Sequence, residues 1–198
     1  MSNATAIGTR ALLRDLKTIP NQLSLSRVFL SVAAIWFLGN ANAEWVMWLS
    51  LASAIVDILD GLIARKLGQT TELGAILDRA TDLMMESVAF FALVVFDIIP
   101  FWLLFVYLFR EFIVTAVRMY MYEIAAPVPK SSLGQRKTNF LMGGFCFAIN
   151  YQYGFVNLGF ATELGQVLGW IGIAGGLLFS YASMAKYLRA FARSYRGT

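Results

Sequence analysis

The sequence contains no histidine and a single cysteine, Cys146, which lies within an apolar run. Without histidine the chain lacks the commonest general base and the commonest transition-metal ligand, so carboxylates become the candidate catalytic groups. Carboxylate oxygens favour hard cations such as Mg²⁺ or Mn²⁺. One cysteine excludes an intrachain disulfide, and we assign no role to Cys146.

Charge is also scarce, because only 14% of the 198 residues are charged while 59% are hydrophobic. The mean hydropathy is +0.65, which excludes an ordinary soluble globular protein. We predict an all-α integral membrane protein whose single domain covers residues 1–198, with room for roughly six spans of about 20 residues. The expected transmembrane helices are residues 22–39, 43–63, 75–97, 99–122, 137–157 and 164–186.

Residues 1–20 precede the first apolar run. Their apolar stretch is short, is interrupted by Arg10, Arg14 and Lys17, and lacks a convincing signal-peptide cleavage site. The leucines among these basic residues predict an N-terminal amphipathic helix that lies on an anionic membrane surface.

The basic residues indicate an orientation in the membrane. Every Lys and Arg falls toward the side that carries both termini and the loops at 64–74 and 123–136, whereas the opposite loops contain only Glu44, Asp97 and Glu163. The positive-inside rule therefore predicts that the termini and the basic side are cytoplasmic. The pI near 9.3 follows from this topology and from anionic lipid, and no nucleic-acid partner is expected.

Four aspartates crowd into residues 57–82, at the edges of two apolar runs where an ionised carboxylate is costly. Asp57 and Asp60 share one helix face, and Asp78 and Asp82 share a face of the next helix. Four such charges repel one another unless cations lie between them. Two Mg²⁺ or Mn²⁺ ions would meet this need and would suit the binding of a pyrophosphate during displacement at phosphorus.

The two helices that carry the aspartates are joined by a short loop, which predicts an antiparallel hairpin. Gly61, Ala64, Gly74 and Ala75 are small enough to permit close approach of the two helices. Arg65 and the glycine-bearing loop add donors of the kind that phosphates need. The site is therefore expected to suit a diphosphate.

The stretch resembles the signature of the CDP-alcohol phosphotransferase family, Asp-x2-Asp-Gly-x2-Ala-Arg-x8-Gly-x3-Asp-x3-Asp. The fixed positions are met, without a gap, by Asp57, Asp60, Gly61, Ala64, Arg65, Gly74, Asp78 and Asp82. The size and six-helix membrane architecture of that family also fit the whole chain. The resemblance implies transfer of a phosphatidyl or similar group from a CDP-linked donor to an alcohol, with release of CMP.

The resemblance also implies roles for the signature residues. The two divalent cations, Mg²⁺ or Mn²⁺, would be bound by Asp57, Asp60, Asp78 and Asp82. Asp82 would in addition be the catalytic general base for the acceptor hydroxyl. The cytidine nucleotide would be contacted by Gly61, Ala64, Arg65 and Gly74, joined by Thr71. A homodimer is a further implication of the family resemblance.

A second group of basic residues, Arg110, Arg118, Arg136 and Lys137, lies in or beside the expected fourth and fifth helices. Cations near a carboxylate site predict a phosphorylated acceptor alcohol, and the alternative is that they anchor helices at lipid headgroups. Arg118 fits headgroup anchoring least, because it lies one or two turns inside an apolar helix.

Two branches of the family compete for the acceptor. The branch that makes phosphatidylglycerophosphate from CDP-diacylglycerol and glycerol 3-phosphate is similar at these positions: Pro20-Asn21, Leu23-Ser24, Arg27, Arg110-Glu111, Val114-Thr115, Arg118, Leu133-Gly134 and Lys137-Thr138. That branch usually reads Asp-Pro-x-Ala-Asp-Lys around its last two acids, which the segment from Asp78 to Leu83 does not. Thr81, Gln69 and Thr71 are closer to inositol-lipid synthases. Glycerol 3-phosphate is the favoured acceptor, and inositol or inositol phosphate is the alternative.

The sequence alone leaves other classes of protein possible. Boundary acids can be merely solvated, and intramembrane acids also mark ion pathways in small transporters, although the outer halves of these helices show no polar relay. Membrane prenyltransferases also bind diphosphates through Mg²⁺ and aspartates, but they favour two separated motifs and more helices. Metal-dependent release of CMP from CDP-diacylglycerol would separate the favoured enzyme from all of these.

Overall fold

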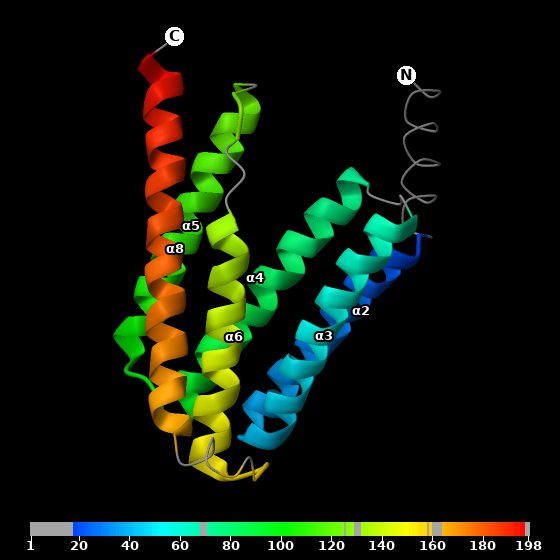
Figure 1. Ribbon diagram of the computed structural model, residues 1–198, viewed down its shortest axis with the longest axis vertical. Helices are drawn as coiled ribbons and strands as arrows, with labels where there is room; N and C mark the ends of the chain where they lie inside the picture. The colour runs from blue at the N-terminus through cyan, green and yellow to red at the C-terminus, as the bar shows by residue number, and fades with distance from the viewer. Residues whose placement is uncertain are drawn as a thin grey trace. The chain divides into compact units, whose positions relative to one another are not determined.

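A computed structural model describes residues 18–67, 71–124, 126–128, 132–157, 159 and 164–196. Within these residues every regular element is an α-helix (Figure 1). The helices are α2 (Ile19–Gly39), α3 (Ala43–Leu67), α4 (Glu72–Val95), α5 (Phe101–Glu123), α6 (Ser132–Tyr153) and α8 (Gly165–Arg196). The all-α prediction is confirmed, and each helix overlaps one of the six expected runs. The predicted amphipathic helix lies, up to residue 17, outside the described residues.

Helix α2 begins at Ile19, earlier than the apolar run predicts, because Pro20 occupies its first turn. Proline suits this position, since its φ is already helical and its missing N–H would have no partner inside the helix. Thr18 is the extended residue before the helix, and its carbonyl oxygen accepts a bond from the Gln22 nitrogen at 3.1 Å. Pro20 therefore starts the first described helix.

Helices α6 and α8 extend furthest beyond the expected runs. Helix α6 begins at Ser132 rather than near residue 137, and α8 continues to Arg196 rather than ending near residue 186. Hydropathy marks where the apolar run ends, whereas backbone hydrogen bonds continue into polar turns that face water or headgroups. Arg136 and Lys186 consequently lie on helices.

Within the described ranges, three segments are long and apolar enough to cross a membrane: Ile19–Gly39, Ala43–Ala64 and Gly165–Tyr195, with mean hydropathies of 1.4, 1.8 and 1.5. Helices α4, α5 and α6 contain 24, 23 and 22 residues. At 1.5 Å per residue, lengths of this order match a hydrocarbon core about 30 Å thick. The structure thus shows three apolar candidates and three further helices of suitable length.

The outer surface of α5 is apolar. Phe101, Phe105, Phe109 and Phe112 are each more than half exposed. Soluble proteins rarely expose so continuous an apolar row, and lipid is its natural environment. This surface supports the prediction of a membrane protein.

The chain divides into two compact units, Met1–Ala89 and Phe90–Thr198. In the first unit α2 packs along α3. In the second unit α8 packs against both α6 and α5 (Figure 1). The division leaves the single-domain assignment of residues 1–198 as a prediction.

Glycines set the close approach of α6 and α8. A Cβ added at Gly144 would lie 2.7 Å from the Ile173 nitrogen, and one at Gly169 would lie 2.9 Å from the Ala148 Cβ. A Cβ at Gly172 would collide with the Gly144 backbone. These contacts are too short for any residue with a side chain, so the packing of the two helices requires glycine.

Helix α2 is apolar outside and polar inside. Phe29, Val32 and Trp36 are more than half exposed. Its buried face carries the polar side chains of Asn21, Ser24, Arg27 and Ser31, none more than 4% exposed. A membrane helix with this pattern hides its polar face against polar partners, and for Ser24 and Arg27 these partners are carboxylates.

Candidate metal and nucleotide site

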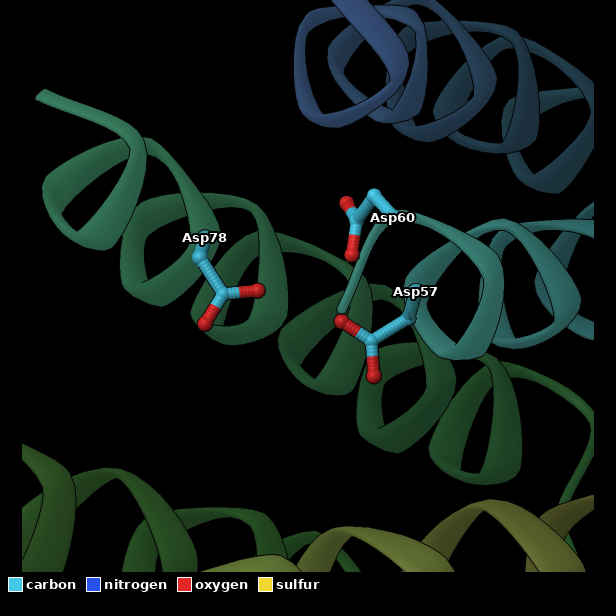
Figure 2. Close-up of side chains that lie close together, drawn as sticks. All are labelled: Asp57, Asp60 and Asp78. Atoms are coloured by element: carbon cyan, nitrogen blue, oxygen red, sulfur yellow. The ribbon is translucent and has the colours of Figure 1, made fainter. Parts of the chain in front are cut away.

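Helices α3 and α4 bring three aspartates together. Asp57, Asp60 and Asp78 each offer a carboxylate oxygen, and these oxygens lie within 4.8 Å of one another. Figure 2 shows the two side chains of α3 and the one of α4 extending into the space between the helices. The spacing that predicted a shared face on each helix is thereby realised for these three residues.

These residues fit a divalent cation. The donor set consists of carboxylate oxygens, which is what Mg²⁺ and Mn²⁺ prefer. Asp60 is buried, while the side chains of Asp57 and Asp78 are 32% and 48% exposed, so the group can still exchange an ion with solvent. Asp82 is not part of this group of three and is bonded instead to Arg27.

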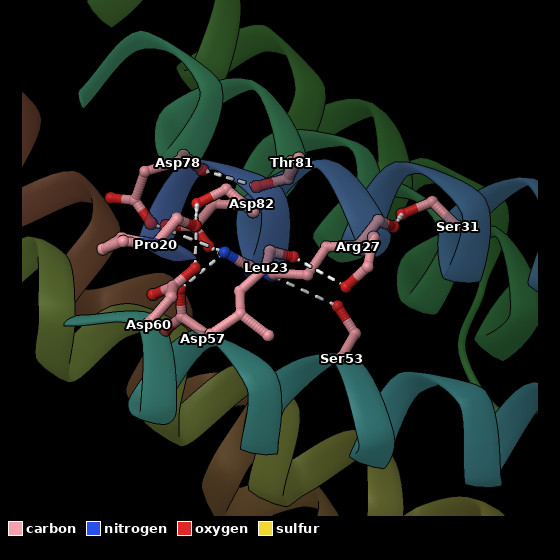
Figure 3. A network of polar contacts seen from close by, with 12 residues as sticks. Pro20, Leu23, Arg27, Ser31, Ser53, Asp57, Asp60, Asp78, Thr81 and Asp82 are labelled. Atoms are coloured by element: carbon pink, nitrogen blue, oxygen red, sulfur yellow. Dashed lines mark hydrogen bonds and ion pairs between the residues drawn. The ribbon is translucent and has the colours of Figure 1, made fainter. Parts of the chain in front are cut away.

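The guanidinium of Arg27, on α2, lies among the carboxylates (Figure 3). Its Nη1 donates to Asp57 Oδ1 at 2.6 Å and lies 3.4 Å from Asp78 Oδ1. Its Nη2 donates to Asp82 Oδ1 at 2.5 Å. The side chain is 4% exposed. Arg27 therefore ties both aspartate pairs to α2.

Ser24 completes the contact between α2 and the aspartates. Its hydroxyl donates to Asp60 Oδ2 at 2.9 Å. Arg27 and Ser24 together reach all four signature aspartates, a role that sequence reasoning missed. The signal was available, because Asn21, Ser24, Arg27 and Ser31 recur at helical spacing in an otherwise apolar run.

Thr71 and Gly74 form the start of α4. Thr71 immediately precedes the helix, and its hydroxyl oxygen accepts a bond from the Gly74 nitrogen at 2.9 Å, as an N-cap does. Asn21 of α2 donates to the same hydroxyl at 3.0 Å. A Cβ at Gly74 would collide with the Asn21 side chain. Gly74 thus lets α2, rather than α3, approach the start of α4.

Gly61 behaves differently from the expectation for the hairpin. A Cβ added there would meet nothing within 4 Å, so Gly61 is not needed for helix packing. It directly follows Asp60 and leaves open space beside the carboxylates. Ala64 is half-buried one turn further along α3. The side chains of Arg65 and Ala75 lie outside the described part of the chain.

In the second unit, the predicted acceptor residues occupy three different environments. Arg110 and Lys137 share Glu111: both donate to its Oε1, Lys137 Nζ at 3.0 Å. Arg110 Nε also donates to the Ser180 carbonyl oxygen at 3.0 Å. Both cations are buried, at 3% and 7% exposure. Sequence reasoning gave Glu111 no role, although it is the acid that joins them.

Arg118 pairs with Tyr187 of α8 instead. Its Nη2 donates to the Tyr187 hydroxyl at 2.5 Å, and its guanidinium carbon lies 4.5 Å from the ring centroid. Its Nε is buried and has no hydrogen-bond partner among the described residues. Arg136 is exposed. The structure therefore joins two of the four predicted cations and leaves Arg118 and Arg136 outside that ion-pair group.

The fold and the first site define a helical, membrane-type protein with carboxylates arranged for a hard cation beside open space. The family follows from comparison with known proteins. The chain belongs to the CDP-alcohol phosphatidyltransferase family, whose model matches residues 17–178. The resemblance drawn from the aspartate signature is confirmed.

Three relatives show the range within this family. A CDP-diacylglycerol--glycerol-3-phosphate 3-phosphatidyltransferase of Bacillus subtilis is 32% identical over 136 residues, 61% of this chain and 70% of the relative. A cardiolipin synthase (CMP-forming) of Streptomyces coelicolor is 28% identical over 163 residues, 77% of this chain and 73% of the relative. A CDP-diacylglycerol--inositol 3-phosphatidyltransferase of Drosophila melanogaster is 38% identical over 64 residues, 32% of this chain and 28% of the relative.

Proposed function

We propose that this protein transfers a phosphatidyl group from CDP-diacylglycerol to glycerol 3-phosphate and releases CMP. The observation that carries the proposal is the group of Asp57, Asp60 and Asp78 inside the family signature. The likeness to the Bacillus subtilis enzyme, which extends well beyond the signature, supports glycerol 3-phosphate as the acceptor.

Two divalent cations, Mg²⁺ or Mn²⁺, are the proposed cofactors. Asp57, Asp60 and Asp78 would hold one, and Asp82 would take part in holding the other. When bound, such ions supply positive charge that stabilises the diphosphate and the departing CMP phosphate. The protein's own contribution is to fix these carboxylates at one place on two helices.

Asp82 is the proposed general base. The acceptor hydroxyl oxygen forms a bond to the phosphorus that carries the diacylglycerol, while the bond from that phosphorus to the oxygen of CMP breaks. CMP leaves with the electron pair of the broken bond, and the hydroxyl proton passes to the Asp82 carboxylate. In the absence of metal, the bond from Arg27 Nη2 to Asp82 Oδ1 holds this carboxylate at the site.

The nucleotide of CDP-diacylglycerol is proposed to bind along Gly61, Ala64, Arg65, Thr71 and Gly74. The open space at Gly61 supports this assignment, because a packing role does not explain the glycine. The bonds from Asn21 and Gly74 to the Thr71 hydroxyl fix the start of α4, whose backbone would face the ligand. Asn21 is therefore a proposed positioning residue.

Arg118 and Lys137 are proposed to bind the phosphate of the acceptor. The Arg118 Nε is a buried donor without a hydrogen-bond partner in the described part of the chain, and an anionic ligand would satisfy it. Burial of Arg110 and Lys137 argues against headgroup anchoring, in which the charged end reaches the membrane surface. Exposed Arg136 is consistent with such anchoring.

A second candidate reaction follows from the Streptomyces coelicolor relative. Cardiolipin carries two phosphatidyl groups on one glycerol, so its formation with release of CMP requires phosphatidylglycerol as acceptor. The inositol relative covers only 32% of this chain, and inositol or inositol phosphate is accordingly the third candidate acceptor.

An acceptor screen tests the proposal. The purified protein in nanodiscs of zwitterionic lipid receives labelled CDP-diacylglycerol and Mg²⁺ or Mn²⁺, with one acceptor at a time: glycerol 3-phosphate, phosphatidylglycerol, inositol, inositol phosphate or serine. We expect CMP release with glycerol 3-phosphate, none after EDTA, and none from the Asp78→Asn control. Preference for an unphosphorylated alcohol or for phosphatidylglycerol would refute the favoured acceptor. Absence of CMP release with every acceptor would favour a transporter.

The membrane arrangement is also a proposal: six spans, both termini and the aspartates on the cytoplasmic side, and a homodimer. Asn40, between α2 and α3, and Lys66, at the other end of α3, are both exposed. In a Cys146→Ala background, a membrane-impermeant maleimide should label Asn40→Cys from outside the cell and Lys66→Cys only after permeabilisation. The reverse labelling pattern would overturn the proposed orientation. The proposed homodimer is tested separately, by mass photometry of the nanodiscs.

A further inference from the structure

Arg27 occupies a place that charge balance would assign to a cation. Its guanidinium contacts carboxylates of both α3 and α4, which are Asp57, Asp78 and Asp82. Arginine stays protonated at any physiological pH, so this positive charge is permanent. The cluster therefore has an internal counter-ion even in the absence of metal.

The two ends of the guanidinium make different contacts. Nη1 is near the group of three aspartates, 2.6 Å from Asp57 Oδ1 and 3.4 Å from Asp78 Oδ1. Nη2 is bonded to Asp82 Oδ1 at 2.5 Å, and Asp82 is outside that group. Asp60 is bonded to Ser24 and to no atom of Arg27 in these contacts. An ion held by the three-aspartate group does not use Asp82, so the Nη2 bond to Asp82 can persist while that ion is bound.

We propose that Arg27 stands in for the second divalent cation and makes the two metal sites unequal. One ion binds at Asp57, Asp60 and Asp78 with Arg27 in place. An ion that uses Asp82 as a ligand must displace Arg27 Nη2 from that carboxylate, and it therefore binds more weakly. This inference rests on the proposed metal-dependent function and concerns the order in which the two ions load.

Burial makes this competition strong. Arg27 is 3% exposed, and its Nε lies 3.4 Å from Ser53 Oγ, so the side chain is held along α3 rather than free to leave into solvent. A charge-assisted bond to a carboxylate is among the stronger hydrogen bonds in proteins. An ion that uses Asp82 has to replace the Nη2 bond to that carboxylate, whereas an ion at the three-aspartate group leaves the Nη2 bond in place.

Mn²⁺ titration followed by electron paramagnetic resonance of the free ion tests this directly. The full-length protein in zwitterionic nanodiscs, without CDP-diacylglycerol, should show one tight and one weak site. Arg27→Gln should lower the Kd of the weak site by roughly tenfold or more, because a charged competitor is lost. Arg27→Lys keeps the charge but cannot fork across two carboxylates, and it should lower that Kd by a smaller factor.

Arg79→Gln is the matched control. Arg79 is exposed on α4 next to Asp78, so this variant removes one positive charge near the cluster without removing the competitor. We expect its weak-site Kd to change by less than about twofold. An equal effect of Arg79→Gln and Arg27→Gln would show that only the general electrostatic field changed, which would refute the inference.

Thermal unfolding separates a counter-ion from a purely structural residue. In EDTA, Arg27→Gln should unfold at a lower temperature than the wild type, because the carboxylates then lack any cation. Saturating Mn²⁺ should restore most of the difference. If the variant stays destabilised in Mn²⁺, Arg27 is a structural anchor and the inference fails. Should Arg27→Gln not fold, Arg27→Lys undergoes the same two measurements, and an unchanged weak-site Kd refutes the inference.

The outcomes also separate this inference from the proposed function. A wild-type protein that binds no Mn²⁺ would remove the basis of both. A wild type with two equal Mn²⁺ sites that still releases CMP would leave the proposed function intact and refute the role of Arg27. One tight and one weak site, with the weak site strengthened only by changes at Arg27, supports both.

Discussion

The two units of the chain contain ion-pair networks of opposite composition. In the first unit one guanidinium, that of Arg27, contacts three aspartates. In the second unit one carboxylate, that of Glu111, receives both Arg110 and Lys137. The first network has an excess of acid and the second an excess of base. Each excess indicates the charge of the ligand that would complete it, a cation in the first unit and an anion in the second.

The networks also differ in exposure. The side chains of Asp57 and Asp78 are 32% and 48% exposed, whereas those of Glu111 and Lys137 are 13% and 9% exposed. An open acidic group can load and release ions, and bound ions relieve the charge repulsion that Arg27 alone leaves uncompensated. A buried, already paired group keeps its geometry without ligand. The acidic network is therefore expected to change most on ligand binding, and the basic network least.

The largest effect is expected from neutralising the acidic network. Asp57→Asn, Asp60→Asn, Asp78→Asn and Asp82→Asn should each lower kcat by roughly 10²- to 10⁴-fold, because a metal ligand or the base is lost. Size-exclusion chromatography in detergent should show a folded protein in each case. Asp82→Asn should keep its affinity for CDP-diacylglycerol better than the others. Near-normal turnover in any two of the four would disprove the two-metal interpretation.

A smaller effect is expected from two cations of the second unit, Lys137 in the basic network and Arg118 outside it. Arg118→Gln and Lys137→Gln should each raise the KM for glycerol 3-phosphate by about tenfold or more, as one charged hydrogen bond contributes about 1.5 to 3 kcal/mol. The KM for CDP-diacylglycerol should change far less. Steady-state kinetics with each substrate varied in turn measures both. Unchanged acceptor KM in both variants would mean that these cations do not bind the acceptor.

Two glycines allow the open acidic site to be compared with the tight packing of the second unit: Gly61 in the first unit and Gly172 in the second. Gly61→Ala should raise the KM for CDP-diacylglycerol by roughly five- to tenfold, because the added methyl enters space proposed for the nucleotide. It should not lower the melting temperature, since nothing lies within 4 Å and alanine favours helix.

Gly172→Ala should have the opposite effect: it should lower the stability of the protein and leave the KM for CDP-diacylglycerol unchanged. Its Cβ would collide with the Gly144 backbone, which predicts a loss of roughly 1 to 3 kcal/mol in unfolding free energy. Gly143→Ala is the control for both measurements, because Gly143 lies on α6 next to Gly144 and an added Cβ there would meet nothing within 4 Å. A destabilised Gly61→Ala variant with unchanged KM would indicate that Gly61 is a packing residue after all.

Much of this arrangement was predictable from the sequence, because it depends on local periodicity. Apolar runs located all six described helices, and spacing placed Asp57 and Asp60 on one face. The family resemblance followed from residues within one continuous segment. Such features need no knowledge of which helix packs against which.

The features that the sequence did not predict are contacts between distant segments of the chain. Arg27 and Asp82 are far apart in sequence, and nothing in either run reveals their bond. The same holds for Arg118 and Tyr187. Small size alone also misled the assignment of Gly61, because composition cannot distinguish a glycine that packs from one that leaves space. Helix ends at polar turns were misplaced because hydropathy falls before the backbone hydrogen bonds do.

The smallest effect is expected at Arg136, the predicted acceptor residue that the structure leaves exposed. An exposed cation contributes little to binding a small ligand, because solvent and salt screen its charge. Arg136→Gln should therefore change the KM for glycerol 3-phosphate by less than about twofold at physiological ionic strength. The matched comparison is Lys137→Gln, the neighbouring residue that is buried and paired with Glu111. If the two variants raise the KM equally, burial does not separate ligand-binding cations from headgroup anchors here, and the contrast between the two networks loses its functional meaning.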